Sequence, residues 1–209
     1  MQSEAMQAGL NFNGELRYAS VFRRVGAGLI DGAIILLFVF GIEWLSPHTR
    51  LLDGIGLVIL YFAGLVYSIY LVKRFGGTPG KRLLNMRICR TDGSAIGYRE
   101  AILRESVQTV FGAVLTIGML MAYLSVSDPD YLSYEIMERA EFLREHAPAW
   151  YGFVDNCYNV WLVSEYIVML TNKRRRSLHD LIAGTVVIHE VRQDQQTGDT
   201  TMSGTTPLA

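Results

Sequence analysis

Four long apolar stretches, separated by segments that carry most of the charge, constrain this chain of 209 residues more than any other feature. Each has about the length that an α-helix needs to cross the hydrocarbon core of a bilayer. The fourth is the least hydrophobic, because it contains Asp155 and Glu165. We therefore expect an all-α membrane protein with four transmembrane helices. The four stretches are residues 25–42, 55–72, 106–124 and 151–170.

The first stretch contains a single charged residue, Asp31. An Asp at the centre of a membrane helix costs roughly 3 kcal/mol, and each Leu, Ile, Val or Phe returns about 0.3–0.6 kcal/mol. Eleven residues of these four types lie in the stretch, so insertion remains favourable. A charge placed in the membrane at such a cost indicates a functional site by default.

On a helix, Arg24, Gly28, Asp31 and Gly32 project from one face. The two glycines form a Gly-x-x-x-Gly pair that allows another helix to approach closely, so we expect Asp31 to point into the bundle. Arg24 lies two turns away, roughly 10 Å along the axis, which is too far for a simple ion pair. Asp31 must therefore take a partner from elsewhere or be protonated. The candidate partners are Arg104, Lys81 and Arg82.

Glu165 is expected at a depth similar to that of Asp31, and two carboxylates at one level could share a proton or bind a hard cation. In that hypothesis Arg24 guards the cytoplasmic mouth, and Asp155 with Asn159 forms the outer approach. The alternative is that Asp31 makes a buried contact that fixes helix packing, and that the polar residues of the fourth helix only face its neighbours. The sequence leaves both open.

The distribution of Lys and Arg predicts the orientation. Of the 19 such residues, 16 fall in the N-terminal part, the segment between the second and third stretches, and the C-terminal part. Both termini and the basic segment should therefore face the cytoplasm. We divide the chain into an N-terminal tail (1–22), a membrane domain (23–190) and a disordered C-terminal tail (191–209), which is rich in Thr, Gln, Gly and Ser.

The acidic segment between the third and fourth stretches should face outward. Its apolar residues recur at spacings of three and four, which predicts an amphipathic helix. Such a helix either caps the bundle or offers a surface to a partner. The apolar residues are Leu132, Ile136, Ala140 and Leu143.

Two cytoplasmic stretches are expected to form a small strand element. Residues 84–90 alternate between apolar and mostly polar side chains, and Asp92-Gly93 is a hairpin signal. Ser177 to Asp180 resembles a helix N-terminus, and residues 185–189 read as a strand. We expect this late strand to pair with the earlier one, which brings the regions around residues 80 and 180 together.

Basic and histidine residues lie near the expected membrane surface. Residues 173–176 set the topology or bind anionic lipids. A tight turn at Gly80 should place Lys81 and Arg82 at the lipid headgroups. His179 beside Asp180 forms a proton relay, or Asp180 simply stabilises the first turn of its helix.

Several other functions are disfavoured. The spacing of residues 76–81 does not fit a phosphate-binding loop, the histidines have no metal-ligand spacing, and no nucleophile–base pair is recognisable. We expect neither an enzyme nor a cofactor, and the near-zero net charge gives no reason to expect nucleic acid binding.

Three blocks of sequence share one pattern between residues 18 and 190. They are Arg24 with Asp31, then Gly77-x-x-Gly80-Lys81 followed by Asp92-Gly93, then Arg176-x-Leu178-His179-Asp180-x-x-Ala183-Gly184-Thr185-x-Val187. Together these blocks resemble the RDD family of multi-pass membrane proteins, whose arginine and two aspartates correspond to Arg24, Asp31 and Asp180; the segment 125–150 is longer than the family pattern. The resemblance implies a bacterial plasma (inner) membrane protein, and a transport role, including sodium–proton exchange, has been proposed for some members.

Two functional hypotheses remain. The first is a transporter or ion-coupled carrier, in which Asp31 and Glu165 bind a proton or cation; four helices are few for a carrier, so a homo-oligomer is implied. The second is a non-catalytic membrane scaffold or assembly factor that acts through a membrane-protein partner.

Overall fold

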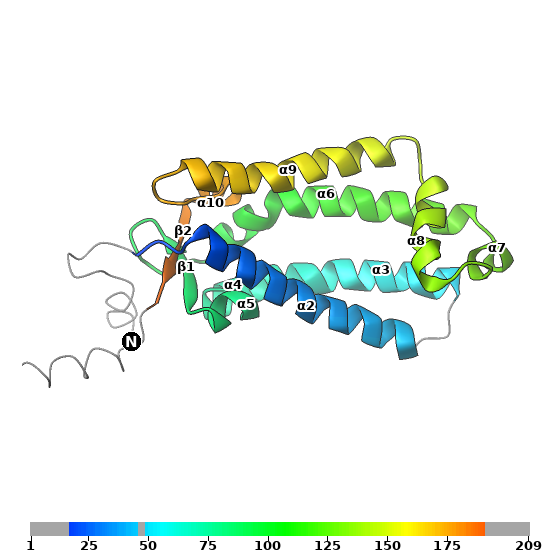
Figure 1. Ribbon diagram of the computed structural model, residues 1–209, viewed down its shortest axis with the longest axis horizontal. Helices are drawn as coiled ribbons and strands as arrows, with labels where there is room; N and C mark the ends of the chain where they lie inside the picture. Colours follow the sequence, from blue (N-terminus) through cyan, green and yellow to red (C-terminus); the bar gives the residue numbers. More distant parts are fainter. Residues whose placement is uncertain (1–16, 46–48, 191–209) are drawn as a thin grey trace, which may run out of the picture.

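The computed structural model describes residues 17–45 and 49–190, and its long helices run side by side along one axis (Figure 1). The predicted tail 191–209 and most of the predicted tail 1–22 lie outside the described residues. The helices follow the four apolar stretches of the sequence closely. They are α2 (Val21–Leu45), α3 (Arg50–Leu65) continued by the π-helix η1 (Val66–Tyr70) and α4 (Leu71–Phe75), α6 (Tyr98–Ser125) and α9 (Tyr151–Thr171).

Within the described residues, three helical segments are long and apolar enough to cross a membrane: Val21–Gly41, Arg50–Leu83 and Tyr98–Ser125. Large apolar side chains on them point away from the protein, as lipid-facing residues should; Leu37 and Val66 are examples. The predicted fourth stretch does form a helix, α9, but its polar residues make it less apolar than the other three. Its crossing of the membrane stays a prediction.

Short elements gather at the two ends of the bundle (Figure 1). One end, here called the strand end, holds the two strands, two short helices and both ends of the described chain. The elements of the strand end are α5 (Pro79–Leu83), β1 (Met86–Arg90), α10 (Leu178–Ala183) and β2 (Thr185–His189). At the opposite end lie α7 (Asp128–Leu132) and α8 (Ile136–Glu145).

The predicted pairing of the late strand with the early one is confirmed. β1 and β2 are antiparallel, with Met86 opposite His189 and Arg90 opposite Thr185. Tyr18 bridges to Ile188 on the other side of β2. Asp92 and Gly93 lie in the turn that follows β1, as their sequence indicated.

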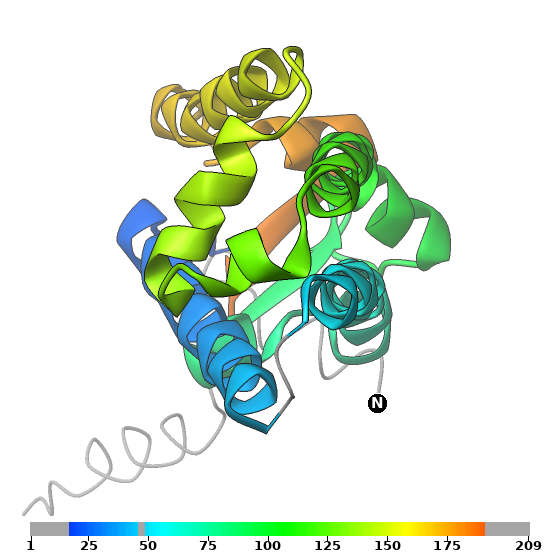
Figure 2. The same cartoon turned by 90° about the vertical axis from the view of Figure 1, so that its right-hand side faces the viewer.

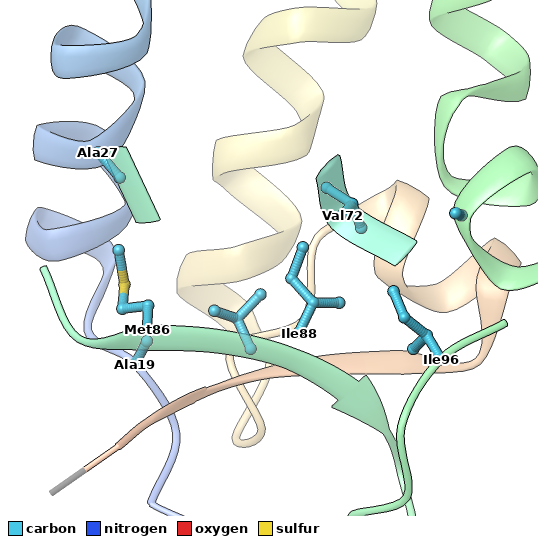
Figure 3. Packing of buried hydrophobic residues seen from close by; sticks show 8 residues of the cluster. Ala19, Ala27, Val72, Met86, Ile88 and Ile96 are labelled. Atoms are coloured by element: carbon cyan, nitrogen blue, oxygen red, sulfur yellow. The ribbon is translucent and has the colours of Figure 1, made fainter. Parts of the chain in front are cut away.

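The main core lies where this sheet meets the helices, rather than along the bundle axis. Met86 and Ile88 of β1 project from the strand towards Ala27 and Val72 of the helices (Figure 3). Burial of this apolar surface fixes the strand pair against the helix ends. The sheet therefore determines where the segments around it lie relative to α2.

The predicted close approach along Gly28 and Gly32 is wrong. Both glycines are exposed, and a methyl group added at either would meet nothing within 4 Å. The close approach on α2 occurs one residue before Gly28, at the fully buried Ala27. There a Cβ on Gly80 of α5 would lie 2.2 Å from the Ala27 carbonyl oxygen.

The acidic segment between α6 and α9, which contains α7 and α8, caps the bundle. α8 lies across the end of the bundle between α9 and α2 (Figure 2). Leu143 is buried beside Tyr131, and the Tyr131 hydroxyl donates to Asp53 of α3 at 2.8 Å. The single predicted amphipathic helix is instead two helices separated at 133–135. Leu132 and Ile136 therefore remain exposed, because the break rotates them off the face that Leu143 buries.

We expect Gly80→Ala to lower the free energy of unfolding by roughly 1–3 kcal/mol or more, because the new methyl group must displace the α2 backbone. Thermal unfolding of the purified protein in detergent measures this. Gly28→Ala is the matched control: it adds the same methyl group in open space and should leave the melting temperature unchanged or slightly higher. Equal effects of the two substitutions would contradict the close approach at Gly80.

Candidate functional site

Asp31 is buried on α2 and accepts three hydrogen bonds from one neighbouring chain segment. The Tyr67 hydroxyl donates to Oδ1 at 2.8 Å, and the Gly80 backbone N–H donates to the same oxygen at 2.7 Å. The Thr78 hydroxyl donates to Oδ2 at 2.5 Å. Asp31 thus points into the bundle as predicted, and it fastens α2 to η1 and α5.

The sequence between α4 and α5 explains how Thr78 and Gly80 reach this carboxylate. Gly76 adopts a left-handed conformation (φ 73°) that ends α4, and Pro79 starts α5. Thr78 occupies the N-cap position but its side chain makes no capping bond to its own helix, because its hydroxyl is directed to Asp31. The glycine-rich turn therefore serves Asp31 rather than a phosphate.

The basic partner that the sequence suggested for Asp31 is not found among the described residues. Arg104 binds Asp180 instead, and Arg82 pairs with Glu190 at 2.8 Å. Lys81 comes closest, since its Nζ donates to the Thr78 hydroxyl at 3.4 Å. All three hydrogen bonds to the Asp31 carboxylate come from neutral groups.

Asp180 has the opposite environment, a fully buried carboxylate between two arginines. Arg24 of α2 donates to Oδ2 at 2.7 Å, and Arg104 of α6 donates to Oδ1. The Ser177 hydroxyl donates to Oδ2 at 3.1 Å and that of Thr185 to Oδ1 at 3.1 Å. This cluster joins α2, α6, α10 and β2 at one point.

Neighbouring positive charges determine the pKa of Asp180. Burial alone would raise the pKa of Asp180, but the charges of Arg104, His179 and Arg24, with the hydrogen bond from Arg24, outweigh burial and hold the pKa far below its ordinary value. Asp180 is therefore ionised at every physiological pH. It acts as the counter-ion of the two arginines rather than as a group that exchanges protons.

Arg176, which belongs to the basic run 173–176 and to the third sequence block, fixes α10 on β2. Its Nη2 donates to the Asp180 carbonyl at 2.9 Å, and its Nε donates to the Thr185 carbonyl at 3.0 Å. Gly184 ends α10 in the left-handed conformation (φ 67°). The sequence did not indicate this packing function, because both acceptors of Arg176 are backbone atoms that no side-chain pattern reveals.

Glu165 and His179 form a third cluster. The Glu165 carboxylate accepts from the His179 backbone N–H at 3.1 Å, and its Oε2 lies 2.6 Å from His179 Nδ1. His179 Nε2 lies 3.0 Å from the Ser177 hydroxyl. Because Ser177 also contacts Asp180, hydrogen-bonding groups run continuously from Glu165 to the arginine cluster.

The two carboxylates that the sequence suggested as a pair have separate partners. No hydrogen bond in the described part of the chain joins Asp31 to Glu165, so sharing of one ion between them stays a prediction. Nor do the described residues contain a group of three or more His, Cys, Asp or Glu that could hold a metal ion.

The residues of the predicted outer approach lie towards the opposite end of α9. Asp155 accepts from Arg144 of α8 at 2.6 Å. Asn159 is exposed, and its amide donates to the Asp155 backbone carbonyl at 2.9 Å. Asp155 thus helps to fasten α8 to α9.

The model of the RDD family matches residues 18–131, a range that contains Arg24 and Asp31 but ends before Asp180. The protein named "Uncharacterized protein YckC" of Bacillus subtilis (strain 168) is 25% identical over 181 residues, which cover 85% of this chain and 89% of the relative. No solved structure matches the chain.

Replacing Asp180 by Asn should lower the free energy of unfolding by about 3–5 kcal/mol, because it leaves two buried arginines without their counter-ion. Thermal unfolding at neutral pH measures the loss. Asp92→Asn is the control, since Asp92 is exposed and its side chain accepts hydrogen bonds from the neighbouring Ser94; the substitution should cost less than about 1 kcal/mol.

The pH dependence gives an independent check on the same variant. A carboxylate with a lowered pKa stabilises the fold above its unfolded pKa, about 3.9, and this contribution is lost as the pH falls towards the folded pKa. The difference in melting temperature between parent and Asp180→Asn should therefore shrink on acidification. A difference that is constant from pH 7 to pH 3 would contradict the assignment.

Proposed function

We propose that this chain, which belongs to the RDD family, is a membrane carrier that couples transport to uptake and release of a proton or small cation at Asp31. One observation carries the proposal: the contrast between its two buried aspartates. Asp180 is held by two arginines, whereas the hydrogen bonds to Asp31 come from neutral donors only. Lys81 interacts with Asp31 by charge, but no lysine or arginine of the described residues forms a direct ion pair with it, so the carboxylate is suited to bind a proton or cation.

The hydroxyl donors keep the free-energy cost of binding a proton or cation at Asp31 low. Hydroxyl groups donate or accept according to need, so Tyr67 and Thr78 can turn to accept a hydrogen bond when Asp31 takes up a proton. An arginine has no acceptor and cannot make this change. The hydroxyl and carboxylate oxygens are also the ligand type that hard cations prefer.

The backbone around Asp31 supports the same function. Tyr67 belongs to the π-helix η1, and π-helical turns occur frequently at functional sites. Gly80 and Thr78 follow the break between α4 and α5. Interrupted helices beside an ion site are a recurring feature of secondary transporters.

In this proposal the cluster of Glu165 and His179 forms a route for protons at the strand end. His179 contacts both Glu165 and Ser177 through its two ring nitrogens. In this scheme Arg24 acts with Asp180 at the cytoplasmic mouth, and Asp155 with Asn159 marks the outer approach. The chain is a carrier rather than an enzyme in this proposal.

Flux into liposomes that contain the purified protein tests the carrier. We expect an imposed pH gradient to drive proton or cation flux in the parent, and Asp31→Asn to abolish it without unfolding, because an amide cannot take up a proton. Asp53→Asn is the matched control: Asp53 also accepts from a tyrosine hydroxyl, that of Tyr131, and should retain flux. Equal flux in the parent and Asp31→Asn would refute the proposal.

The second candidate is a scaffold or assembly factor, and one observation favours it. The three bonds of Asp31 join α2 to η1 and α5, which is what a purely structural carboxylate would do. The exposed Ile136 and Met137 on α8 then offer an apolar surface to a membrane-protein partner. A parent without flux, together with an Asp31→Asn variant that unfolds, would favour this candidate.

We also propose the membrane arrangement that the carrier needs: a bacterial plasma membrane protein with four transmembrane helices, assembled as a homo-oligomer. α9 has 21 residues, about 32 Å of helix, which is enough to span a bilayer. Its Glu165 is buried inside the protein rather than exposed to lipid. The concentration of Lys and Arg at the strand end supports an orientation with both termini in the cytoplasm.

Cysteine labelling tests the orientation. A membrane-impermeant maleimide added to intact cells should label Glu135→Cys, between α7 and α8, and should label Asp92→Cys only after the membrane is permeabilised. The parent supplies the background, because burial raises the pKa of the Cys89 thiol to about 11 and thiolate is the reactive form. Labelling of position 92 but not 135 in intact cells would reverse the orientation.

A further inference from the structure

A basic pocket lies at the strand end, between the end of α4 and the start of the sheet. It has a volume of about 430 Å³, which is within the range of small-molecule sites. Its charged lining residues are Lys73, Arg74, Arg82, Arg87 and Glu190. Four basic side chains against one carboxylate give the pocket a clear preference for an anion.

The basic residues of the pocket are not equivalent. Glu190 pairs with Arg82 at 2.8 Å and lies 3.5 Å from Arg87. Lys73 and Arg74 have no carboxylate partner within 17–45 and 49–190. Lys73 Nζ instead lies 4.8 Å from the centre of the Tyr98 ring. Arg74 lies over the Phe75 ring, 5.8 Å from its centre. Neither ring neutralises its cation, so both charges are available to a ligand.

The surroundings indicate an amphiphilic anion. Lys73 and Arg74 form the last turn of a long apolar helical segment, where a span would meet the headgroup layer. Phe75, which lines the pocket, is 53% exposed, and Leu83 of the adjacent α5 is 67% exposed. Exposed apolar side chains beside a basic pocket suit a headgroup that carries acyl chains better than a soluble phosphate compound.

We propose that this pocket binds the phosphate headgroup of an anionic membrane lipid, with Lys73 and Arg74 as its principal contacts. Lysine and arginine beside a membrane surface attract acidic lipids by charge, and a built pocket adds a defined position to that attraction. The pocket differs from the basic run at residues 173–176, which is the lipid-binding candidate that the sequence suggested. The lipid-binding proposal does not depend on whether Asp31 supports transport.

The test measures lipid retention by the purified full-length protein in a neutral detergent, titrated with phosphatidylglycerol or phosphatidylcholine and read by native mass spectrometry. The parent should retain phosphatidylglycerol preferentially. Lys73→Gln combined with Arg74→Gln should weaken that binding about tenfold or more. Lys173→Gln combined with Arg174→Gln removes the same charge from exposed positions at the same end of the molecule and should change it less than about threefold.

Glu190→Gln supplies a test that misfolding cannot imitate. It removes the one carboxylate of the pocket lining and should tighten phosphatidylglycerol binding. Equal weakening by both double variants would reduce the effect to surface attraction and overturn the proposal. Weaker binding by Glu190→Gln, or no preference over phosphatidylcholine, would do the same. Inorganic phosphate or glycerol phosphate bound as tightly as phosphatidylglycerol would overturn the assignment to lipid.

Discussion

The ion cluster of Arg24, Asp180 and Arg104 is the interaction on which the arrangement of the strand end depends. A buried charge is tolerated only when it is paired and hydrogen-bonded, and Asp180 meets this requirement with groups from α2, α6, α10 and β2. Arg24 and Asp180 are 156 positions apart in the chain, so their contact closes the whole fold. The sheet then packs against the helix ends, because α10 leads directly into β2.

The two charged residues of α2 each bind a different segment at the strand end. Arg24 fastens the late segment that contains α10, and Asp31, two turns further along, fastens the earlier segment that contains α5. The two later sequence blocks therefore each contribute one contact with α2, which itself contains the first block. α2 is the only element of the described chain that carries both an arginine and an aspartate into these clusters.

The helices and the two strands were predictable, because each depends on local hydrophobic pattern and turn signals. The inward direction of Asp31 was predicted correctly, but from the Gly28 and Gly32 pair, which does not make the close approach. The assignment of partners was not: Arg104 could reach either aspartate from its place in the sequence, and only the packing of α6 against α10 decides for Asp180. The close approach was assigned to Gly28 and Gly32, yet Ala27 makes it, because helix rotation within a bundle is set by neighbours rather than by a motif. The break between α7 and α8 was missed because Leu132 and Ile136 happen to keep helical spacing across it.

The environments of the two aspartates also bear on which ion suits Asp31. Arg24 and Arg104 together with Asp180 leave one net positive charge at the strand end of the bundle, and Lys81 adds another beside Thr78. Any cation that approached Asp31 from this end, a proton included, would meet these positive charges, part of which Glu165 offsets. A metal cation would in addition have to give up its hydration shell in a poorly hydrated interior, which is costly. A proton that binds Asp31 instead forms a neutral carboxylic acid, so within the proposed carrier the proton suits Asp31 better than a metal cation does.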